Sequence, residues 1–493
     1  MTGRTAEFGA VAAGHPVTAQ AALSILREGG NAFDAIVAAL WTASVVEPVL
    51  ASPGGGGFLM AHTPEKTDLV DFFVDTPKAR RPADGLDYAE IHADFGTATQ
   101  AFHIGRGASA TPGFVPGLFH IAGTYGSLPM TRLVAPAVAA AREGVTMTPF
   151  QAYLFSVVTP ILTWTEEARA LFAPRGTLLG AGETFRNPDL ADTIEETGRT
   201  RADMWTRGVM AERLLTGQRE AGSLREGDLA GYRIETRTPL CARLGRYRVF
   251  LNPPPSLGGA LIMAMNAKAG PRPVDLARAV DAIDTVWRQE PEDAGRLVAM
   301  ADAVSNGGVA SRGTTHVSVV DTFGNAAAAT VSNGEGNGHI VPRSGFMLNN
   351  MLGEEDLNPR GHHAWKPGRR LGSMMAPTVA VGEDDGSLLA LGSGGSNRIR
   401  TAILQVLVRR LGQGMALAEA IEHPRLHVER GHLDFEAGLG ETETAALTAA
   451  FPDHRAWPER NLFFGGVHGV ERDADGTIAG AGDSRREGTF LSA

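Results

Sequence analysis

Three consecutive segments decide the fold: T-T-H-V-S-V-V-D at residues 314–321, T-F-G-N at residues 322–325 and A-A-A-A-T-V-S at residues 326–332. The first is rich in β-branched residues, which favour strands, and the second has the composition of a turn. The third predicts a returning strand, so the three together predict a β-hairpin. Sequence on either side mixes helical and strand patterns, which predicts sheets sandwiched between helical layers.

The N-terminal part predicts two helices and a tightly packed glycine run. Apolar residues recur at helical spacing over Val17–Glu28, with Thr18 as a candidate cap and Gly29-Gly30 as a stop signal. A second helix is expected from Phe33 to about Val45, and its apolar character on all sides indicates burial between layers. Four glycines at Gly54–Gly57 indicate close backbone approach at the edge of a core strand.

The rest of the chain predicts helices from about residue 133 to residue 304, and alternating elements after the hairpin. One of these expected helices covers Asp293–Ala303. The elements expected after the hairpin are strands at Gly345–Leu348, Thr378–Val381 and Leu388–Gly392 and helices at Ile399–Arg410 and Ala416–Glu422.

Composition excludes several classes of function. The chain has 493 residues, of which 43% are hydrophobic and 20% charged, and this is ample for a large buried core. A net charge of −10 without a strong Lys/Arg cluster argues against nucleic-acid binding. The single Cys241 excludes an internal disulfide and a Cys-based zinc site, and its strand-like context predicts a buried structural thiol.

Targeting and metal-binding signals are weak throughout. Met1–Gln20 lacks the apolar region of a signal peptide, and the most apolar stretch, Ala35–Val46, is too short to span a bilayer. We therefore expect a cytoplasmic protein without membrane contact. His339 and His362-His363 lack regular ligand spacing with carboxylates, so neither a metal nor another cofactor is expected.

Gly313-Thr314 is a candidate site of self-cleavage. Gly313 can adopt backbone angles that other residues avoid, and the Thr314 hydroxyl can attack the carbonyl that precedes it. An N-to-O acyl shift and hydrolysis would free the Thr314 amine, whose pKa of about 7.7–8.0 suits a general base. Taken alone, a Thr-Thr pair at the start of a strand is commonplace.

A glycine loop at Gly392–Arg398 is the second candidate for chemistry. It lies between an expected strand and an expected helix, where backbone N–H groups can form an oxyanion hole. A phosphate cradle is less favoured, because no Gly-Lys-Ser/Thr follows. The loop can also be a plain tight connection between the two elements.

Several blocks in order along nearly the whole chain resemble the gamma-glutamyltranspeptidase family. Taken together they are far more specific than any single motif. They are Gly29–Ala35, Val45–Pro48 followed by Gly54–Phe58, Ala110–Gly113, Tyr125-Gly126, Pro253–Gly259, Thr314–Asp321 and Leu348–Asn350.

The resemblance implies a four-layer αββα fold made of two intertwined fragments of one precursor. Residues 1–313 would form a large subunit and residues 314–493 a small one, and the two would stay associated. Thr314 would be the nucleophile, Ser332 would bond to its new amine, and Gly394 and Gly395 would form the oxyanion hole.

The positions that grip a gamma-glutamyl group depart from the family pattern. Phe73 stands where the family has a carboxylate-binding Arg, and a phenyl ring cannot form that bidentate clamp. Met351 replaces a Gln, and Gly372 replaces one of two serines while Ser373 remains. Three arginines that could supply the lost charge are Arg80, Arg81 and Arg106. The other implied substrate contacts are Asn333 or Gly334 and Glu354 or Glu355.

The sequence therefore predicts a self-processing amide hydrolase or acyltransferase with an altered acyl group, of the acylase kind or a small carboxylated amide. Its partners would be a small-molecule amide and, for transfer, an amine or peptide acceptor. A genuine gamma-glutamyl transpeptidase or glutathione hydrolase with a rebuilt pocket is the alternative. An unprocessed scaffold or binding protein is the alternative of another class.

Overall fold

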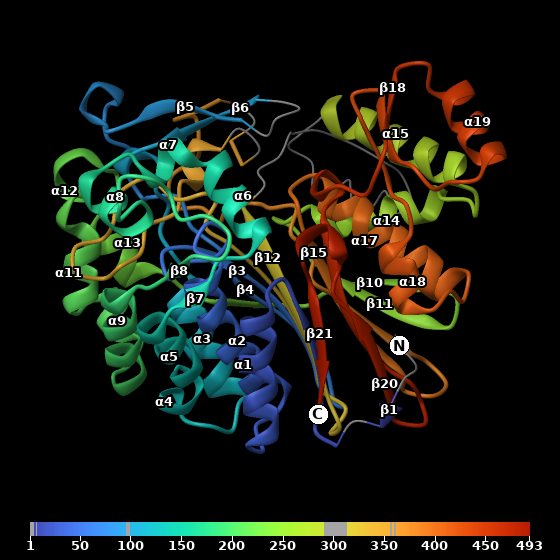
Figure 1. The fold of residues 1–493 in the computed structure, drawn as a ribbon, viewed down its shortest axis with the longest axis horizontal. Coiled ribbons are helices and arrows are strands. Elements are labelled where there is room, and N and C mark those ends of the chain that lie inside the picture. The colour runs from blue at the N-terminus through green and yellow to red at the C-terminus, as the bar shows by residue number, and fades with distance from the viewer. Residues whose placement is uncertain (1–3, 6, 95–98, 290–312, 355–356, 359–360) are drawn as a thin grey trace.

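Two antiparallel sheets of seven strands form the centre of the molecule (Figure 1). The computed structural model describes residues 4–5, 7–94, 99–289, 313–354, 357–358 and 361–493. The first sheet contains, in spatial order, β21 (Thr489–Ser492), β2 (Gly9–Ala13), β12 (Thr314–Asp321), β13 (Ala326–Ser332), β3 (Gly56–His62), β4 (Thr67–Phe72) and β9 (Glu235–Arg237). The second contains β1 (Arg4–Thr5), β20 (Thr477–Ala481), β19 (Gly466–Arg472), β15 (Leu388–Gly394), β14 (Thr378–Gly382), β11 (Tyr247–Leu251) and β10 (Leu240–Leu244).

Helices lie on both sides of the two sheets (Figure 1). The helices α1 (Pro16–Arg27), α2 (Ala32–Val46) and α3 (Phe114–Tyr125) pack on the first sheet. The second sheet is covered by α14 (Gly258–Lys268), α17 (Arg398–Leu407) and α18 (Leu417–Glu422). The expected mixture of helices and sheets is confirmed.

The hairpin β12–β13 lies in the middle of the first sheet and is buried on both faces. Val317 and Val319 belong to the apolar core beneath α1 and α2, whereas Val320 belongs to the core between the sheets. Thr314 pairs with Ser332 at one end of the hairpin. The prediction of a hairpin is confirmed, and its buried faces explain why the sequence is apolar rather than strictly alternating.

The first two helices lie within one residue or two of their predicted bounds. The cap of α2 is Asn31, whose side chain accepts from the Phe33 and Asp34 backbone N–H groups at 2.8 and 3.0 Å. The prediction that Thr18 caps α1 is wrong, because His15 Nδ1 accepts from the Val17 N–H at 3.2 Å. Thr18 lies inside the helix and is fully buried.

Two further predictions are wrong. Residues 345–348 form only isolated bridges, because the chain there follows a turn at residues 341–346 instead of pairing along a sheet. Cys241 lies in a strand as expected, but that strand, β10, is a sheet edge and the thiol is exposed. The helix expected at Asp293–Ala303 falls outside the described residues.

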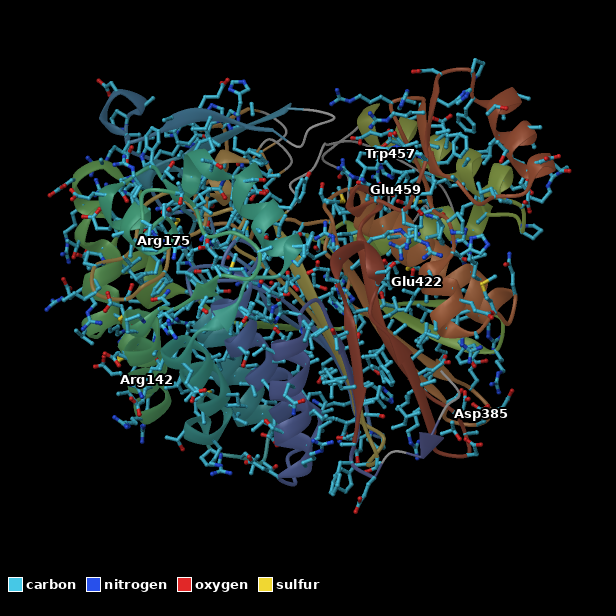
Figure 2. The ribbon with its side chains drawn as sticks, in the orientation of Figure 1. Arg142, Arg175, Asp385, Glu422, Trp457 and Glu459 are labelled. Atoms are coloured by element: carbon cyan, nitrogen blue, oxygen red, sulfur yellow. The ribbon has the colours of Figure 1, made fainter. Side chains whose placement is uncertain are left out.

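Shorter elements surround the sheets. Charged side chains such as Arg142 and Arg175 lie on the outside of these elements (Figure 2). None of the helices in the described ranges combines the length and apolar character needed to cross a bilayer. The remaining elements are α4 (Met130–Leu133), α5 (Ala135–Glu143), α6 (Pro149–Val157), α7 (Thr159–Leu162), α8 (Glu166–Phe172), α9 (Pro188–Arg199), α10 (Asp203–Thr206), α11 (Val209–Thr216), α12 (Gln218–Ala221), α13 (Glu226–Gly231), α15 (Pro273–Gln289), α19 (Glu441–Ala450), and the small sheets β5 (Ala89–Asp94) with β6 (Thr99–Ile104), β7 (Val145–Thr146) with β8 (Thr184–Phe185), and β16 (Leu426–Glu429) with β17 (His432–Glu436) and β18 (His454–Trp457).

Candidate active site

Three strand ends meet between the two sheets. Thr314 begins β12, Ser332 ends β13 and Gly394 ends β15. A Cβ atom on Gly394 would lie 2.2 Å from the Thr314 carbonyl oxygen, so the two backbones approach too closely for any side chain there. The structure therefore brings three of the predicted catalytic residues together.

The Gly313–Thr314 peptide is held on both sides. The Ser332 hydroxyl donates a hydrogen bond to the Gly313 carbonyl oxygen, and the same hydroxyl accepts from the Gly334 N–H at 3.0 Å. The Gly313 N–H donates to Glu335 Oε1 at 3.1 Å. A Cβ on Gly313 would lie 1.6 Å from the Gly334 carbonyl oxygen, so only glycine fits before Thr314.

The glycine loop after β15 rests on a buried arginine. Gly395 has a φ of +117°, a conformation that side chains disfavour, which explains the glycine. Arg486 Nη1 donates to the Thr314 carbonyl oxygen at 3.3 Å. Its two terminal nitrogens also lie 2.9 and 3.1 Å from where Cβ atoms on Gly394 and Gly395 would stand.

Arg486 was not identified from the sequence. It follows Asp483 in the 3-10 helix Ser484–Arg486 near the C-terminus, 172 residues from Thr314, and no local motif marks it. Burial lowers the pKa of its guanidinium to about 10. Its position against both Thr314 and the glycine loop makes it a candidate positioning residue.

A buried acid lies behind the start of β12. Burial raises the pKa of Glu47 to about 7, although a hydrogen bond from Thr315 and the charge of Arg486 oppose the shift. A Cβ on Gly14 would lie 2.9 Å from Glu47 Oε1, 3.0 Å from Thr315 Oγ1 and 3.4 Å from His468 Nε2. These three groups therefore converge on one glycine beside Thr315. Glu47 lies in the Val45–Pro48 block of the family resemblance, but the sequence assigns it no role of its own.

Two of the predicted substrate contacts lie close to Ser332. Asn333 follows it directly and is buried, and neither atom of its side-chain amide has a hydrogen-bond partner among the described residues. At Gly334 a Cβ would stand 2.3 Å from Glu354 Oε1 and 2.0 Å from Asn350 Oδ1. Glu355 falls outside the described residues.

Two other predicted substrate contacts are buried in the apolar core, and a third is partly buried at a turn. The ring of Phe73 stacks on Phe58 with centroids 5.3 Å apart, and Met351 belongs to the same apolar core. Ser373 lies against another turn, where its carbonyl oxygen accepts from the Ser256 hydroxyl at 2.8 Å and the Leu257 N–H at 2.9 Å. No contact between these three residues and Thr314 is seen in the described ranges, and their roles stay predictions.

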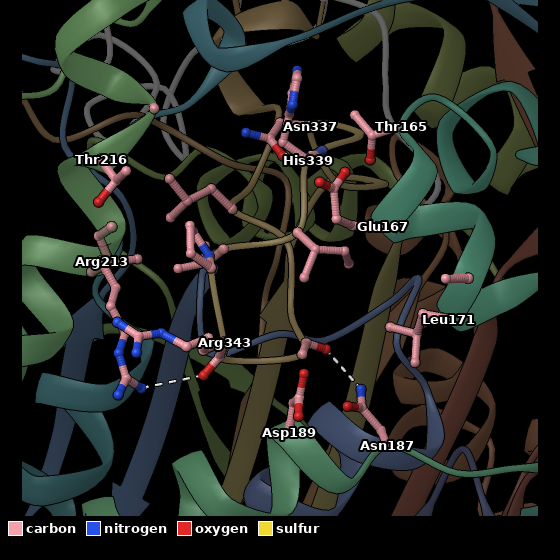
Figure 3. Close-up of a pocket in the computed structure, with 18 of the residues that line it drawn as sticks. Thr165, Glu167, Leu171, Asn187, Asp189, Arg213, Thr216, Asn337, His339 and Arg343 are labelled. Atoms are coloured by element: carbon pink, nitrogen blue, oxygen red, sulfur yellow. Dashed lines mark hydrogen bonds between the residues drawn. The ribbon is translucent and has the colours of Figure 1, made fainter.

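The three candidate replacement arginines have different surroundings. Arg80 lies 5.2 Å from the centroid of the Trp365 ring. Arg81 donates to the carbonyl oxygens of residues 219, 220 and 222. Arg106 lines a cavity of about 780 Å³ (Figure 3), but Thr314 does not line that cavity.

The described residues include no group of three or more His, Cys, Asp or Glu side chains placed to hold a metal ion. The polar groups around Thr314 are instead hydroxyl, amide, carboxylate and guanidinium groups. Such a set can polarise a carbonyl and move a proton at a hydroxyl.

Comparisons with known proteins give one family. The gamma-glutamyltranspeptidase family matches residues 18–289 and 290–493. The acylase ACY 1 proenzyme of Pseudomonas sp. (strain V22) is 29% identical over 528 residues, which cover 98% of this chain and 93% of that protein. The glutathione hydrolase proenzyme of Escherichia coli (strain K12) is also 29% identical, over 537 residues that cover 97% and 91%.

Solved structures give the same fold. The cephalosporin acylase from Bacillus halodurans has a TM-score of 0.84 and 24% identity, with 100% of this chain and 97% of that chain covered. The gamma-glutamyltranspeptidase of Helicobacter pylori has a TM-score of 0.50 and 22% identity, with 59% and 90% covered. The match along both parts of the sequence shows that this chain belongs to the gamma-glutamyltranspeptidase family and is an enzyme of the amidohydrolase or acyltransferase type.

Proposed function

We propose that this enzyme cuts its own chain between Gly313 and Thr314 and then uses Thr314 as an N-terminal nucleophile on amide substrates. The observation that carries the proposal is the hydrogen bond from the Ser332 hydroxyl to the Gly313 carbonyl oxygen. That bond polarises the carbonyl group that the Thr314 hydroxyl has to attack. The bond from the Gly313 N–H to Glu335 holds the same peptide in place.

The self-cleavage follows from these contacts in two steps. The Thr314 hydroxyl oxygen adds to the Gly313 carbonyl carbon, and the peptide C–N bond breaks to leave an ester and a free Thr314 amine. Water then hydrolyses the ester. In turnover, the free amine accepts the hydroxyl proton while the oxygen attacks a substrate amide, and N–H groups near Gly394 and Gly395 stabilise the developing oxyanion. The substrate C–N bond then breaks, the leaving amine takes that proton, and water or an acceptor amine releases the acyl group from Thr314.

The two fragments, residues 1–313 and 314–493, would remain one body after the cut. In the first sheet β12 pairs with β2 on one side, and β13 pairs with β3 on the other. The second sheet likewise mixes β10 and β11 with β14 and β15. Because strands of both fragments share both sheets, we infer the four-layer αββα sandwich of N-terminal-nucleophile hydrolases, held by pairing that the cut leaves intact.

We further propose that the acyl group is not an ordinary gamma-glutamyl group. Phe73, at the place of the expected carboxylate-binding Arg, is buried against Phe58. Arg80 and Arg81 have other contacts. Loss of a bidentate arginine clamp is expected to cost on the order of 2–5 kcal/mol in binding a carboxylate. The name of the acylase relative agrees with an acyl group other than gamma-glutamyl, whereas the name of the equally similar glutathione hydrolase does not.

A gamma-glutamyl hydrolase is the second candidate, and one observation favours it. Glu354 Oε1 lies beside Gly334, two residues after Ser332. A buried carboxylate there can bind the ammonium group that gamma-glutamyl compounds carry.

A matched set of 4-nitroanilides tests the choice. Gamma-glutamyl, glutaryl and pentanoyl anilides differ only in the α-ammonium and carboxylate groups. We expect kcat/KM for the gamma-glutamyl anilide to be no higher than for the other two. An advantage of about 100-fold or more for gamma-glutamyl, roughly 2.7 kcal/mol, would establish the second candidate instead.

A further inference from the structure

Thr314 is not among the residues that line the cavity of about 780 Å³. Figure 3 shows this cavity. Its walls come from α8, α9, α11 and the segment of residues 337–348. Its size is within the range of small-molecule sites. Four arginines line it, and the arrangement of two of them points to a ligand.

Arg213 presents donors that the protein leaves unused. Its Nη1 donates to the Arg343 carbonyl oxygen at 3.2 Å, which brings the two arginines together at one side of the cavity (Figure 3). Its Nε is buried and has no hydrogen-bond partner among the described residues. No acidic side chain in the described ranges forms an ion pair with Arg213 or Arg343.

Arg343 is held in a backbone conformation that arginine disfavours. Its φ is +54°, in the left-handed region that glycine occupies without strain. The turn is closed by a bond from the Val341 N–H to the Phe346 carbonyl oxygen at 2.8 Å. The side chain of Asn187, the N-cap of α9, fixes the turn by donating to the Gly345 carbonyl oxygen at 2.7 Å (Figure 3).

The other two arginines are engaged elsewhere. Arg186 Nε donates to the Glu143 carbonyl oxygen at 3.0 Å. Arg106 packs on Gly217, where a Cβ would lie 2.3 Å from its Nε. None of the four arginines forms an ion pair among the described residues, but Arg213 and Arg343 are the two that lie side by side on the cavity wall, joined by the bond from Arg213 Nη1 to the Arg343 carbonyl oxygen.

Acidic side chains elsewhere on the wall limit the charge of a ligand. Glu167, Asp189 and Glu220 also line the cavity and form no ion pair among the described residues. Their charges repel a polyanion, whereas a single carboxylate needs only the two neighbouring guanidinium groups.

We propose that this cavity binds a small molecule through one carboxylate, which Arg213 and Arg343 hold. The site is separate from the Thr314 chemistry and does not depend on self-cleavage. The chain connects the two sites. The wall segment of residues 337–348 follows shortly after Glu335, whose side chain accepts from the Gly313 N–H.

The test is ligand-observed NMR on the full chain carrying Thr314→Ala, so that no covalent chemistry interferes. The probes are N-acetylglycine, its neutral N-methylamide and inorganic phosphate. We expect N-acetylglycine to bind and the neutral amide not to bind. Tighter binding of phosphate, or equal binding of the neutral amide, would overturn the assignment of a carboxylate.

Variants of the two arginines locate the site. Arg213→Met and Arg343→Gly should each weaken binding of N-acetylglycine by about 10-fold or more, the loss of one charged hydrogen-bonding group. Arg343→Gly relieves the left-handed strain, so its melting temperature should not fall while its binding does. Arg219→Met is the control, because Arg219 lies on the neighbouring α12 in ion pairs with Glu212 and Glu226. Unchanged binding in Arg343→Gly would overturn the proposal.

Discussion

The strand ends around Thr314 and the positions expected to select the acyl group are built in different ways. Around Thr314 the geometry comes from backbone pairing and from glycines that admit no side chain. At Phe73 and Met351 the side chains belong to an apolar core. The difference indicates that the machinery of cleavage depends on backbone geometry, which can persist while the side chains that choose a substrate are replaced.

The largest expected effect comes from replacing Phe73 with arginine, the residue that the family has at this position. Phe73→Arg places a charge against Phe58 in the core, and we expect a loss of stability on the order of 3–5 kcal/mol. Chemical denaturation measures it. Phe323→Arg is the control, because Phe323 is 70% exposed. A stable Phe73→Arg variant that gains gamma-glutamyl activity would show that this position faces the substrate instead.

Gly394→Ala tests the backbone side of the comparison. The added methyl group would meet the Thr314 carbonyl oxygen, and we expect self-cleavage to slow by on the order of 10²–10³-fold. Gel electrophoresis over time measures the rate. Gly412→Ala is the matched control, since a Cβ there meets no atom within 4 Å. Cleavage at the wild-type rate in Gly394→Ala would contradict the close approach of Gly394 to the Thr314 carbonyl oxygen.

Ser332 should show a smaller effect that depends on its hydroxyl. Ser332→Ala removes the donor to the Gly313 carbonyl and should slow cleavage by about 10-fold to 100-fold, whereas Ser332→Thr keeps a hydroxyl and should stay near wild type. The time course of processing separates the two variants. Equal rates in both would mean that the hydroxyl has no role.

The most gradual expected effect is a pH dependence of stability set by Glu47. Its pKa is raised from 4.5 to about 7 by burial, so the folded state binds more protons than the unfolded state between those values. Stability should therefore fall as the pH rises through this window, by no more than about 1.4 kcal/mol per pH unit. Glu47→Gln should remove that slope in denaturation curves. An unchanged slope would place the titrating group elsewhere.

Local signals predicted the local structure well. The turn at Thr322–Asn325 and the β-branched run before it were enough to predict β12 and β13, and the apolar run from Phe33 to Val45 predicted α2 to within one residue at each end. The run of four glycines at Gly54–Gly57 also predicted a close backbone approach. The structure confirms it, since Cβ atoms there would lie 2.3–2.8 Å from backbone oxygens.

Contacts between distant segments were not predictable from the sequence. Arg486 reaches Thr314 across 172 residues, and Glu47 matters only because burial raises its pKa. The run at Gly345–Leu348 has a strand composition, but contacts from Asn187 and Arg213 hold the chain there in a turn. Cys241 lies on a sheet edge, and one sequence does not reveal which strand ends a sheet.

The most direct test of the central claim is the denatured mass of the freshly purified protein, wild type beside Thr314→Ala. We expect two fragments in the wild type, the smaller beginning at Thr314, and one intact chain in the variant. Thr314→Ser should still be cut, because it keeps a hydroxyl. A single uncut chain in the wild type, or a cut at another position, would contradict the account.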